Sequence, residues 1–260
     1  MKHKFNCLSY YLCLFWVACV ANYSHALNID DIDFITENYP PYNYLENGQL
    51  QGISIDLLLL MLNKLESKKS LVDIHIQPWA RGYSTLITTA NTCLFSVVRT
   101  KARDPLFHWI GPISATSIAM IARKDKHIKI NSKEDFLKYK IGVVRADVGE
   151  QLLLEMGVDS SHLDHIGGMN VIIQSIKKLD KNRLDVFAYD NQPVFRTIKK
   201  HGLNVNDYEV VYVLQKGDLY YACNRKVPEV QIKKLQNVLD QLKAEGTYQQ
   251  VVDRYQNKFK

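Results

Sequence analysis

Residues 36–42 read Thr-Glu-Asn-Tyr-Pro-Pro-Tyr. The residues that lead into them, Ile29–Thr36, alternate apolar and polar side chains, a pattern that predicts a half-buried strand. The proline pair excludes both continued strand pairing and helix at that point, because proline cannot donate a backbone hydrogen bond. Tyr39 and Tyr42 are therefore expected at the C-terminal edge of a sheet, where open α/β sheets bind ligands and aromatic faces supply rigid apolar contact area. A surface turn is the ordinary alternative for such a run taken alone.

Strands and helices are expected to alternate in two successive groups. The first group contains a helix at Ser54–Glu66 and strands at Ile29–Thr36, Val72–Gln77 and Cys93–Val98. The second contains strands at Ile141–Val144 and Asp185–Tyr189 and helices at Gly149–Met156, Asn170–Leu179 and Gln192–Lys200. Repeats of this kind build parallel sheets with helices on their faces. We therefore expect an α/β fold with two lobes, each a mainly parallel sheet flanked by helices.

Two hinge crossings are expected to join the lobes. Ser114–Ala122 is a continuous extended run, and a second crossing, Tyr208–Cys223, is expected to contain a turn at Gln215–Asp218. The chain then ends in two predicted helices, Val230–Ala244 and one that Thr247 caps and that buries Phe259. This organisation predicts lobe 1 at residues 27–115 and 220–260 and lobe 2 at residues 116–219.

Residues 1–26 have the features of a secretory signal peptide. The apolar run Leu8–Ala21 is followed by a small-residue cleavage site at Ser24–Ala26. That run is shorter than the ~20 residues of a bilayer-spanning helix. Cys19 only weakly matches a lipoprotein signal, so we expect a periplasmic protein without a lipid anchor.

Loss of Lys2 and Lys4 with the signal lowers the formal net charge from +6 to +4, and no block of Lys or Arg remains. This distribution does not indicate a nucleic-acid partner. Cys93 and Cys223 are the cysteines left in an oxidising compartment. The sequence leaves open whether they form a disulfide or stay as two buried thiols.

The motif around the two tyrosines continues with Gly48 and with Gly52–Leu57, which reads Gly-Ile-Ser-Ile-Asp-Leu. Together with the ending Ala244–Tyr248, it resembles the extracellular solute-binding proteins of family 3, the amino-acid-binding type with the type II periplasmic fold. The resemblance implies a monomer that closes two lobes around a small polar ligand. It also implies a membrane partner, either the permease of an ABC transporter or a sensor.

Thr100–Arg103 resembles the family's Thr-x-x-Arg motif, in which the arginine grips the α-carboxylate of the ligand. A guanidinium suits that role, because it forms two parallel hydrogen bonds with a carboxylate and keeps its charge when desolvated. We therefore predict Thr100 and Arg103 as ligand-binding residues. The alternative for an arginine after a strand is a solvated surface charge.

Asp185–Asp190 resembles the second-lobe motif in which the closing aspartate pairs with the ammonium of the ligand. Asp190 is therefore predicted to face Arg103 across the cleft. Its alternative role is to cap the helix that begins near Gln192.

Three further side chains are predicted to contact the ligand. Pro78–Gly82 resembles the family's Trp-x-Arg segment, in which Trp79 could stack on the ligand and Arg81 could bind an anion. Ser96, near the end of its strand, offers a hydroxyl. Plain core packing is the alternative for Trp79 and Ser96.

Two positions depart from the family pattern. Val98 stands where relatives often carry Ser or Thr, and Arg145–Gly149 replaces the Gly-Ser/Thr pair that opens the first helix of lobe 2. Asp147 would repel a carboxylate at that helix N-terminus, where anions normally bind. The ligand is then not a standard α-amino acid, or it carries a cationic group that faces Asp147. Arg99 and Arg145 would equally suit an anionic ligand.

A catalytic function is the competing hypothesis, because some proteins that resemble this family are periplasmic dehydratases or carry a lytic transglycosylase domain. Glu37 and His165 are the candidate acid and base. The sequence shows no His/Cys metal spacing, phosphate-binding Gly loop or nucleophile elbow. We therefore expect a binding protein without a cofactor rather than an enzyme.

Overall fold

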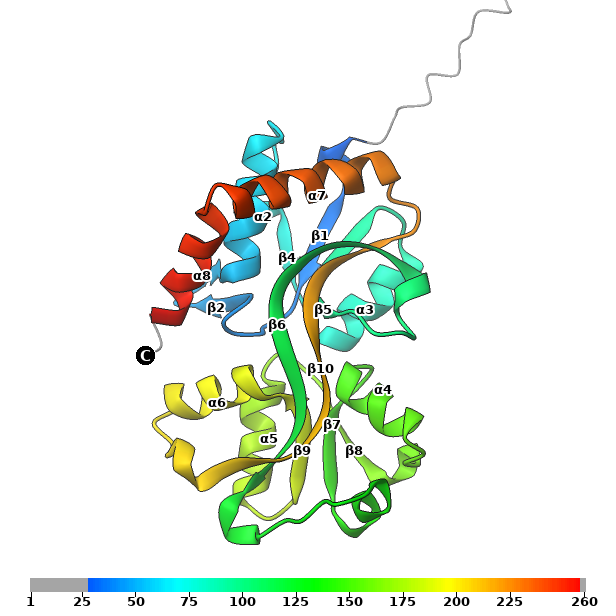
Figure 1. The fold of residues 1–260 in the computed structure, drawn as a ribbon, viewed down its shortest axis with the longest axis vertical. Helices are drawn as coiled ribbons and strands as arrows, with labels where there is room; N and C mark the ends of the chain where they lie inside the picture. The colour runs from blue at the N-terminus through cyan, green and yellow to red at the C-terminus, as the bar shows by residue number, and fades with distance from the viewer. Residues whose placement is uncertain (1–27, 258–260) are drawn as a thin grey trace, which may run out of the picture.

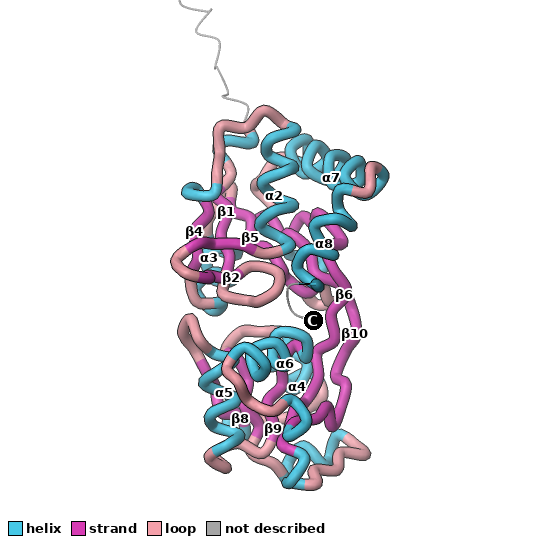
Figure 2. Tube along the Cα trace, turned by 90° about the vertical axis from the view of Figure 1, so that its left-hand side faces the viewer, coloured by secondary structure: helices cyan, strands magenta, loops and turns pink. Residues whose placement is uncertain are grey.

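The structure is a computed structural model that describes residues 28–257. The expected signal peptide and Phe259 lie outside these residues. Two lobes are stacked along the long axis, and two long strands, β6 (Phe107–Arg123) and β10 (Tyr208–Asn224), run from one lobe into the other (Figure 1). Figure 2 shows both strands along one side of the molecule. This arrangement confirms the expected α/β class with two lobes.

Within residues 28–257, the strands of both lobes form one eight-stranded sheet in the order β4-β1-β5-β10-β6-β9-β7-β8. In lobe 1, β1 (Asp33–Thr36) is parallel to β4 (Ile74–Ile76) and β5 (Thr92–Val98). In lobe 2, β7 (Ile141–Val144) is parallel to β8 (Leu163–Ile166) and β9 (Val186–Asp190). The two crossing strands are antiparallel to each other and to their outer neighbours. A small hairpin, β2 (Tyr44–Glu46) and β3 (Gln49–Gln51), follows the Tyr-Pro-Pro-Tyr loop.

The helices cover the faces of the sheet. Lobe 1 carries α2 (Ile53–Lys64), α3 (Trp79–Thr88), α7 (Glu229–Ala244) and α8 (Thr247–Asn257). Lobe 2 carries α4 (Val148–Glu155), α5 (Val171–Asp180) and α6 (Asn191–Lys200). The last two helices pack against α2, so both ends of the described chain belong to lobe 1 (Figure 1). Among residues 28–257, no helix combines the length and apolarity needed to cross a bilayer.

Two predicted strands begin later than expected. Ile29–Asp31 and Leu71–Asp73 are short 3-10 turns that precede β1 and β4. In each turn a polar side chain caps the backbone, since Asn28 and Ser70 start capping boxes that an aspartate closes. Asn, Ser and Asp therefore overrode the apolar alternation at these positions.

The turn predicted at Gln215–Asp218 is wrong. β10 continues through these residues, and Lys216 and Gly217 pair with Ser117 and Thr116 of β6. Register shifts on either side, between Val213 and Gln215 and again after Leu219, bend the strand without interrupting it. Gly217 lies in a regularly paired stretch of β10 between these irregularities rather than in a turn.

Cys93 and Cys223 form a disulfide that joins β5 to β10. They are register partners on adjacent antiparallel strands, with Cα atoms 4.0 Å apart. The sequence had left this question open. The bond lies in lobe 1 and ties the last strand to the core strand next to it.

Candidate functional site

The candidate site lies between the lobes, where the ends of β1 and β5 face the ends of β7 and β9. These are the C-terminal ends of parallel strands, where open α/β sheets place their ligand-binding loops. The loop after β1 carries Tyr39 and Tyr42. Gly52 anchors that loop, because a Cβ at this position would lie 2.2 Å from the carbonyl oxygen of Tyr42. A glycine is therefore required where the motif has one.

Tyr39 and Tyr42 reach from lobe 1 to lobe 2. The Tyr39 hydroxyl donates a hydrogen bond to Asp190 Oδ2 at 2.8 Å. The Tyr42 hydroxyl donates to Gln192 Oε1 at 2.5 Å. Both tyrosines are buried. The surface-turn alternative is therefore wrong for this pair in the structure, and the two hydroxyls bridge the lobes.

Asp190 ends β9 and begins α6. Its Oδ1 atom accepts the backbone N–H of Gln192 at 3.1 Å, which is the capping role considered from the sequence. Its Oδ2 atom accepts the hydroxyls of Tyr39 and Thr116, the latter at 2.7 Å. Burial raises the pKa of this carboxyl, while the bonds from Thr116 and Tyr39 act against the rise. Asp190 thus caps the helix and faces the other lobe at once.

Arg103 is buried, with 1% of its surface exposed. Its guanidinium lies 4.9 Å from the ring centroid of Tyr83 and 5.5 Å from that of Trp79. Its Nε donates to Gln151 Oε1 of α4 at 2.8 Å. Thr100 supports the turn, because its Oγ1 accepts the backbone N–H of Arg103 at 3.2 Å. The structure therefore places Arg103 at the interface of the lobes and not on the solvated surface.

Trp79 starts α3 and stacks on Tyr83 at 5.5 Å with an interplanar angle of 20°. Its indole N–H is buried and has no hydrogen-bond partner among residues 28–257. A buried donor without a partner costs free energy. Trp79 therefore packs against Tyr83 and also holds a buried N–H that could donate a hydrogen bond to a ligand. Plain core packing does not explain this unpaired donor.

Two further carboxyls are buried beside the guanidinium. Asp147 is the N-cap residue of α4, and burial raises its pKa to about 6 against the opposing charge of Arg103. Glu37 follows β1, and burial together with Asp147 raises its pKa well above the ordinary value. Asp147 and Glu37 thus place two carboxyls beside one guanidinium, and Asp190 adds a third carboxyl at the interface of the lobes.

The remaining sequence-predicted residues have different surroundings. The Ser96 hydroxyl is 2.8 Å from Ser54 Oγ and also donates to Asn43, so its hydrogen bonds go to lobe 1 itself. Arg81 is exposed and is not brought into the cluster. Arg99 pairs with Asp104 at the surface, and Arg145 is exposed.

The loop that leads into α4 is held in an unusual conformation. Ala146 has φ +61°, a left-handed value that is unfavourable for a residue with a Cβ. Its N–H donates to Glu150, and its carbonyl accepts Arg103 Nη2 at 3.4 Å. Glu150 in turn lies 2.6 Å from His165 Nε2. Glu150 therefore positions a carbonyl that contacts Arg103.

Sequence reasoning missed several members of this cluster. Tyr83 could have been found, because it lies one helical turn after Trp79 on the same face. Gln151 and Gln192 lie in the first turns of helices that follow strands, a position that suggests contact with the sheet edge without identifying the partner. Glu150 gave no signal beyond its place on a helix.

Two α/β lobes joined by two strands, with buried aromatic and charged side chains where the lobes meet, form the arrangement of a two-lobed solute-binding protein. The chain belongs to the bacterial extracellular solute-binding proteins, family 3, and matches this family over residues 33–258. This match confirms the resemblance seen in the motifs.

Individual relatives share less than a quarter of their residues with this chain. A protein of Neisseria gonorrhoeae named "Probable histidine-binding protein" is 23% identical over 221 residues, which cover 84% of this chain and 79% of that protein. A histidine kinase sensor domain with similarity to periplasmic binding proteins superposes with a TM-score of 0.74 at 16% identity, covering 86% of this chain and 95% of that one. An amino acid ABC transporter substrate-binding protein from Streptococcus pneumoniae, bound to L-arginine, gives 0.68 at 20% identity, covering 86% and 92%. The structural likenesses show the fold.

Proposed function

We propose that this protein captures an amino-acid-like ligand in the compartment between its lobes, in the periplasm, for uptake by an ABC transporter. The observation that carries the proposal is the position of Arg103, which is buried beside the stacked rings of Trp79 and Tyr83 and reaches the opposite lobe through Gln151. A guanidinium in this setting is suited to the carboxylate of a ligand. The carboxylate of Asp190 is suited to the α-ammonium group of the same ligand, because the two charges are opposite.

The acids point to a ligand with a second positive charge. Asp147 and Asp190 exceed the single guanidinium by one charge when both are ionised, whereas the raised pKa of Glu37 favours its neutral form. An amino acid with a cationic side chain would offset this excess, whereas a neutral one would leave a buried carboxylate unpaired. Relatives that bind histidine or arginine, by their names, agree with this class.

Closure follows from the contacts between the lobes. Tyr39 with Asp190, Tyr42 with Gln192 and Arg103 with Gln151 each join one lobe to the other. We place the boundaries at residues 115 and 219 in the crossing strands, so that residues 28–115 and 220–257 move as one body and residues 116–219 as the other. A ligand that contacts both bodies favours the closed form.

A thermal-shift screen of amino acids, polyamines, keto acids and small peptides would find the ligand. We expect a cationic amino acid to raise the melting temperature. Arg103→Ala should then weaken its binding by about 2–5 kcal/mol, a loss of roughly 30-fold or more. Arg81→Ala is the matched control, because Arg81 is an exposed arginine of the same lobe. If calorimetry finds that the Arg103→Ala protein binds the ligand as tightly as the unchanged protein does, Arg103 does not contact the ligand.

Sensing is the second candidate, and the likeness to a histidine kinase sensor domain gives it support at the level of the fold. Both functions need the same closure and differ in the membrane partner that contacts the closed lobes. A permease gene next to the gene of this protein would favour transport. Catalysis has less support, since Glu37 lies beside Arg103 and Asp147, whereas His165 contacts Glu150.

A further inference from the structure

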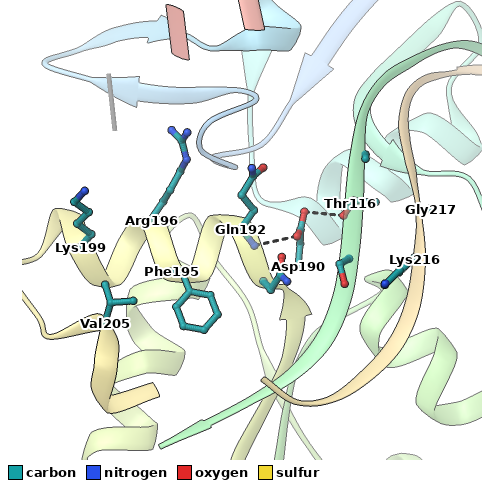
Figure 3. A pocket seen from close by; sticks show the side chains of 12 residues that line it. Thr116, Asp190, Gln192, Phe195, Arg196, Lys199, Val205, Lys216 and Gly217 are labelled. Carbon is teal, nitrogen blue, oxygen red and sulfur yellow. Dashed lines mark hydrogen bonds between the residues drawn. The ribbon is translucent and has the colours of Figure 1, made fainter. Parts of the chain in front are cut away.

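We propose that the protein has a second binding pocket, separate from the compartment around Arg103, for an organic anion with an aromatic body. This hinge pocket has a volume of about 620 Å³ and opens beside the crossing strands (Figure 3). The residues that carry the argument are Phe195, Arg196 and Lys199 of α6, Val205, and Lys216 and Gly217 of β10. Its size falls within the range of pockets that hold small molecules, ~300–1,000 Å³.

The hinge pocket is lined by residues of α6 and the crossing strands, whereas Asp147 and Gln151, near Arg103, belong to α4 and its N-cap. Asp190 lies at the boundary. Its carboxylate accepts bonds from Tyr39, Thr116 and the Gln192 backbone, which hold it toward the interface of the lobes. The other charged groups that line the hinge pocket are cations.

The charges around the hinge pocket select an anion. Arg196, Lys199 and Lys216 contribute three positive charges, against the single carboxylate of Asp190. Figure 3 shows Lys216 on the β10 side and the Phe195 ring on the α6 side of the same hollow. A carboxylate or sulfonate near Lys216 would be attracted by these cations.

The apolar wall selects the body of that anion. Phe195 and Val205 are half-buried and line the hollow next to the cations. A flat ring can lie against the Phe195 ring and Val205 while its acid group remains near Lys216, as ring pairs stabilise each other beyond their buried area. Inorganic anions would gain the charge attraction alone. An aromatic carboxylate therefore fits the pocket better than phosphate does.

The hinge pocket is coupled to the arrangement of the lobes. Thr116 and Gly217 line it, and they are register partners in the crossing strands. Arg196 also donates through Nη2 to the carbonyl of Tyr255 in α8 of lobe 1, at 3.2 Å. An anion that contacts this wall in the closed form favours closure, and closure favours the anion to the same extent. The pocket is thus placed to adjust the affinity of the compartment.

Isotope-edited NMR of the purified protein with 1-naphthoate as the probe tests the proposal. We expect the largest amide shifts at Asn191, Lys216 and Gly217, smaller shifts at Arg103 through closure, and none at Ser96. Lys199→Gln and Lys216→Gln should each weaken the probe about threefold, the usual scale for a partly exposed charge. Phe195→Ala should weaken it at least as much.

Lys177→Gln is the matched control, because Lys177 is an exposed lysine of lobe 2 on α5, outside the pocket. We expect it to bind the probe as the unchanged protein does. Far-UV circular dichroism of every variant separates lost binding from lost folding. Absence of shifts, shifts centred on Arg103, or equal affinity in the two lysine variants would each overturn the proposal. Inorganic phosphate that binds as tightly as 1-naphthoate would overturn the aromatic part.

Discussion

Tyr39 of lobe 1 donates its hydroxyl to the carboxylate of Asp190 in lobe 2 at 2.8 Å, and both side chains are buried. Tyr39→Phe keeps the ring and removes this one bond. A buried charged acceptor that loses a donor costs about 1–3 kcal/mol, so we expect the ligand affinity to fall roughly tenfold. Isothermal titration calorimetry with the ligand from the screen measures the change.

Tyr208→Phe is the control for that variant. Tyr208 donates to Asp180 Oδ1 at 2.5 Å, so it forms the same kind of bond within lobe 2 alone. Its loss should lower the melting temperature and leave the affinity unchanged. Equal losses of affinity in the two variants would show that the bond from Tyr39 has no special part in closure.

Asp147 should make stability depend on pH. Burial raises its pKa from 3.8 to about 6, so the folded protein favours the neutral carboxyl. Its contribution to stability is complete below about pH 4 and is lost as the pH rises through about 6. Asp147→Asn keeps a neutral side chain at every pH. Relative to the unchanged protein, its unfolding free energy should therefore rise by up to about 3 kcal/mol between pH 4 and pH 7. Urea denaturation at each pH measures this difference, and an NMR titration of Asp147 with a midpoint near 4 would contradict it.

Glu150 should act on binding through Ala146. Its carboxylate holds the N–H of Ala146, whose carbonyl contacts Arg103. Glu150→Ala removes an acceptor of the kind that a helix cap supplies, whose loss costs about 1 kcal/mol of stability. Ala146 would then no longer be held in its left-handed conformation. We expect about fivefold weaker ligand binding. Glu150→Gln should restore most of it, because an amide oxygen can accept the same bond.

Glu155→Ala is the control on the same helix, since Glu155 is exposed at the end of α4. It should bind the ligand with unchanged affinity. Wild-type affinity in the Glu150→Ala protein would mean that the loop keeps its conformation without that carboxylate.

The disulfide between Cys93 and Cys223 should stabilise the protein strongly. It closes a loop with a sequence separation of 130, and bonds that close long loops contribute about 2–5 kcal/mol. Reduction with dithiothreitol should lower the urea midpoint accordingly. The Cys93→Ala/Cys223→Ala protein should not respond to the reductant. Two alkylatable thiols in the unreduced protein would show that the bond does not form.

Much of the fold could be predicted from local sequence because the signals are local. β1 ends shortly before the proline pair, the apolar periodicity of Ser54–Glu66 gives α2, and the alternation of strands and helices gives two parallel groups. The continuous strand β10 could not be predicted. Its Lys-Gly-Asp segment has turn chemistry, and only pairing with β6, about a hundred residues away in sequence, overrides that preference.

In the candidate site too, residues within local motifs could be predicted, whereas contacts between distant segments could not. Arg103 and Asp190 could be placed from their motifs, and the structure brings both to the interface of the lobes. Arg81 could not be distinguished from Trp79 by its motif. Two residues apart on α3 they point to different sides, so that Trp79 is buried and Arg81 is exposed. Gln151 could not be assigned to Arg103, because it comes from the other lobe.

Lobe 1 is assembled from both ends of the chain, and lobe 2 from one uninterrupted stretch. During synthesis from the N-terminus, lobe 2 can therefore be completed before lobe 1. Lobe 1 is completed last, because β10, α7 and α8 are synthesised last, and α7 and α8 cover the apolar side of α2. Fragments that end after Arg123 or after Asn224 would thus expose the apolar side of α2 to solvent. Such fragments would be prone to aggregate.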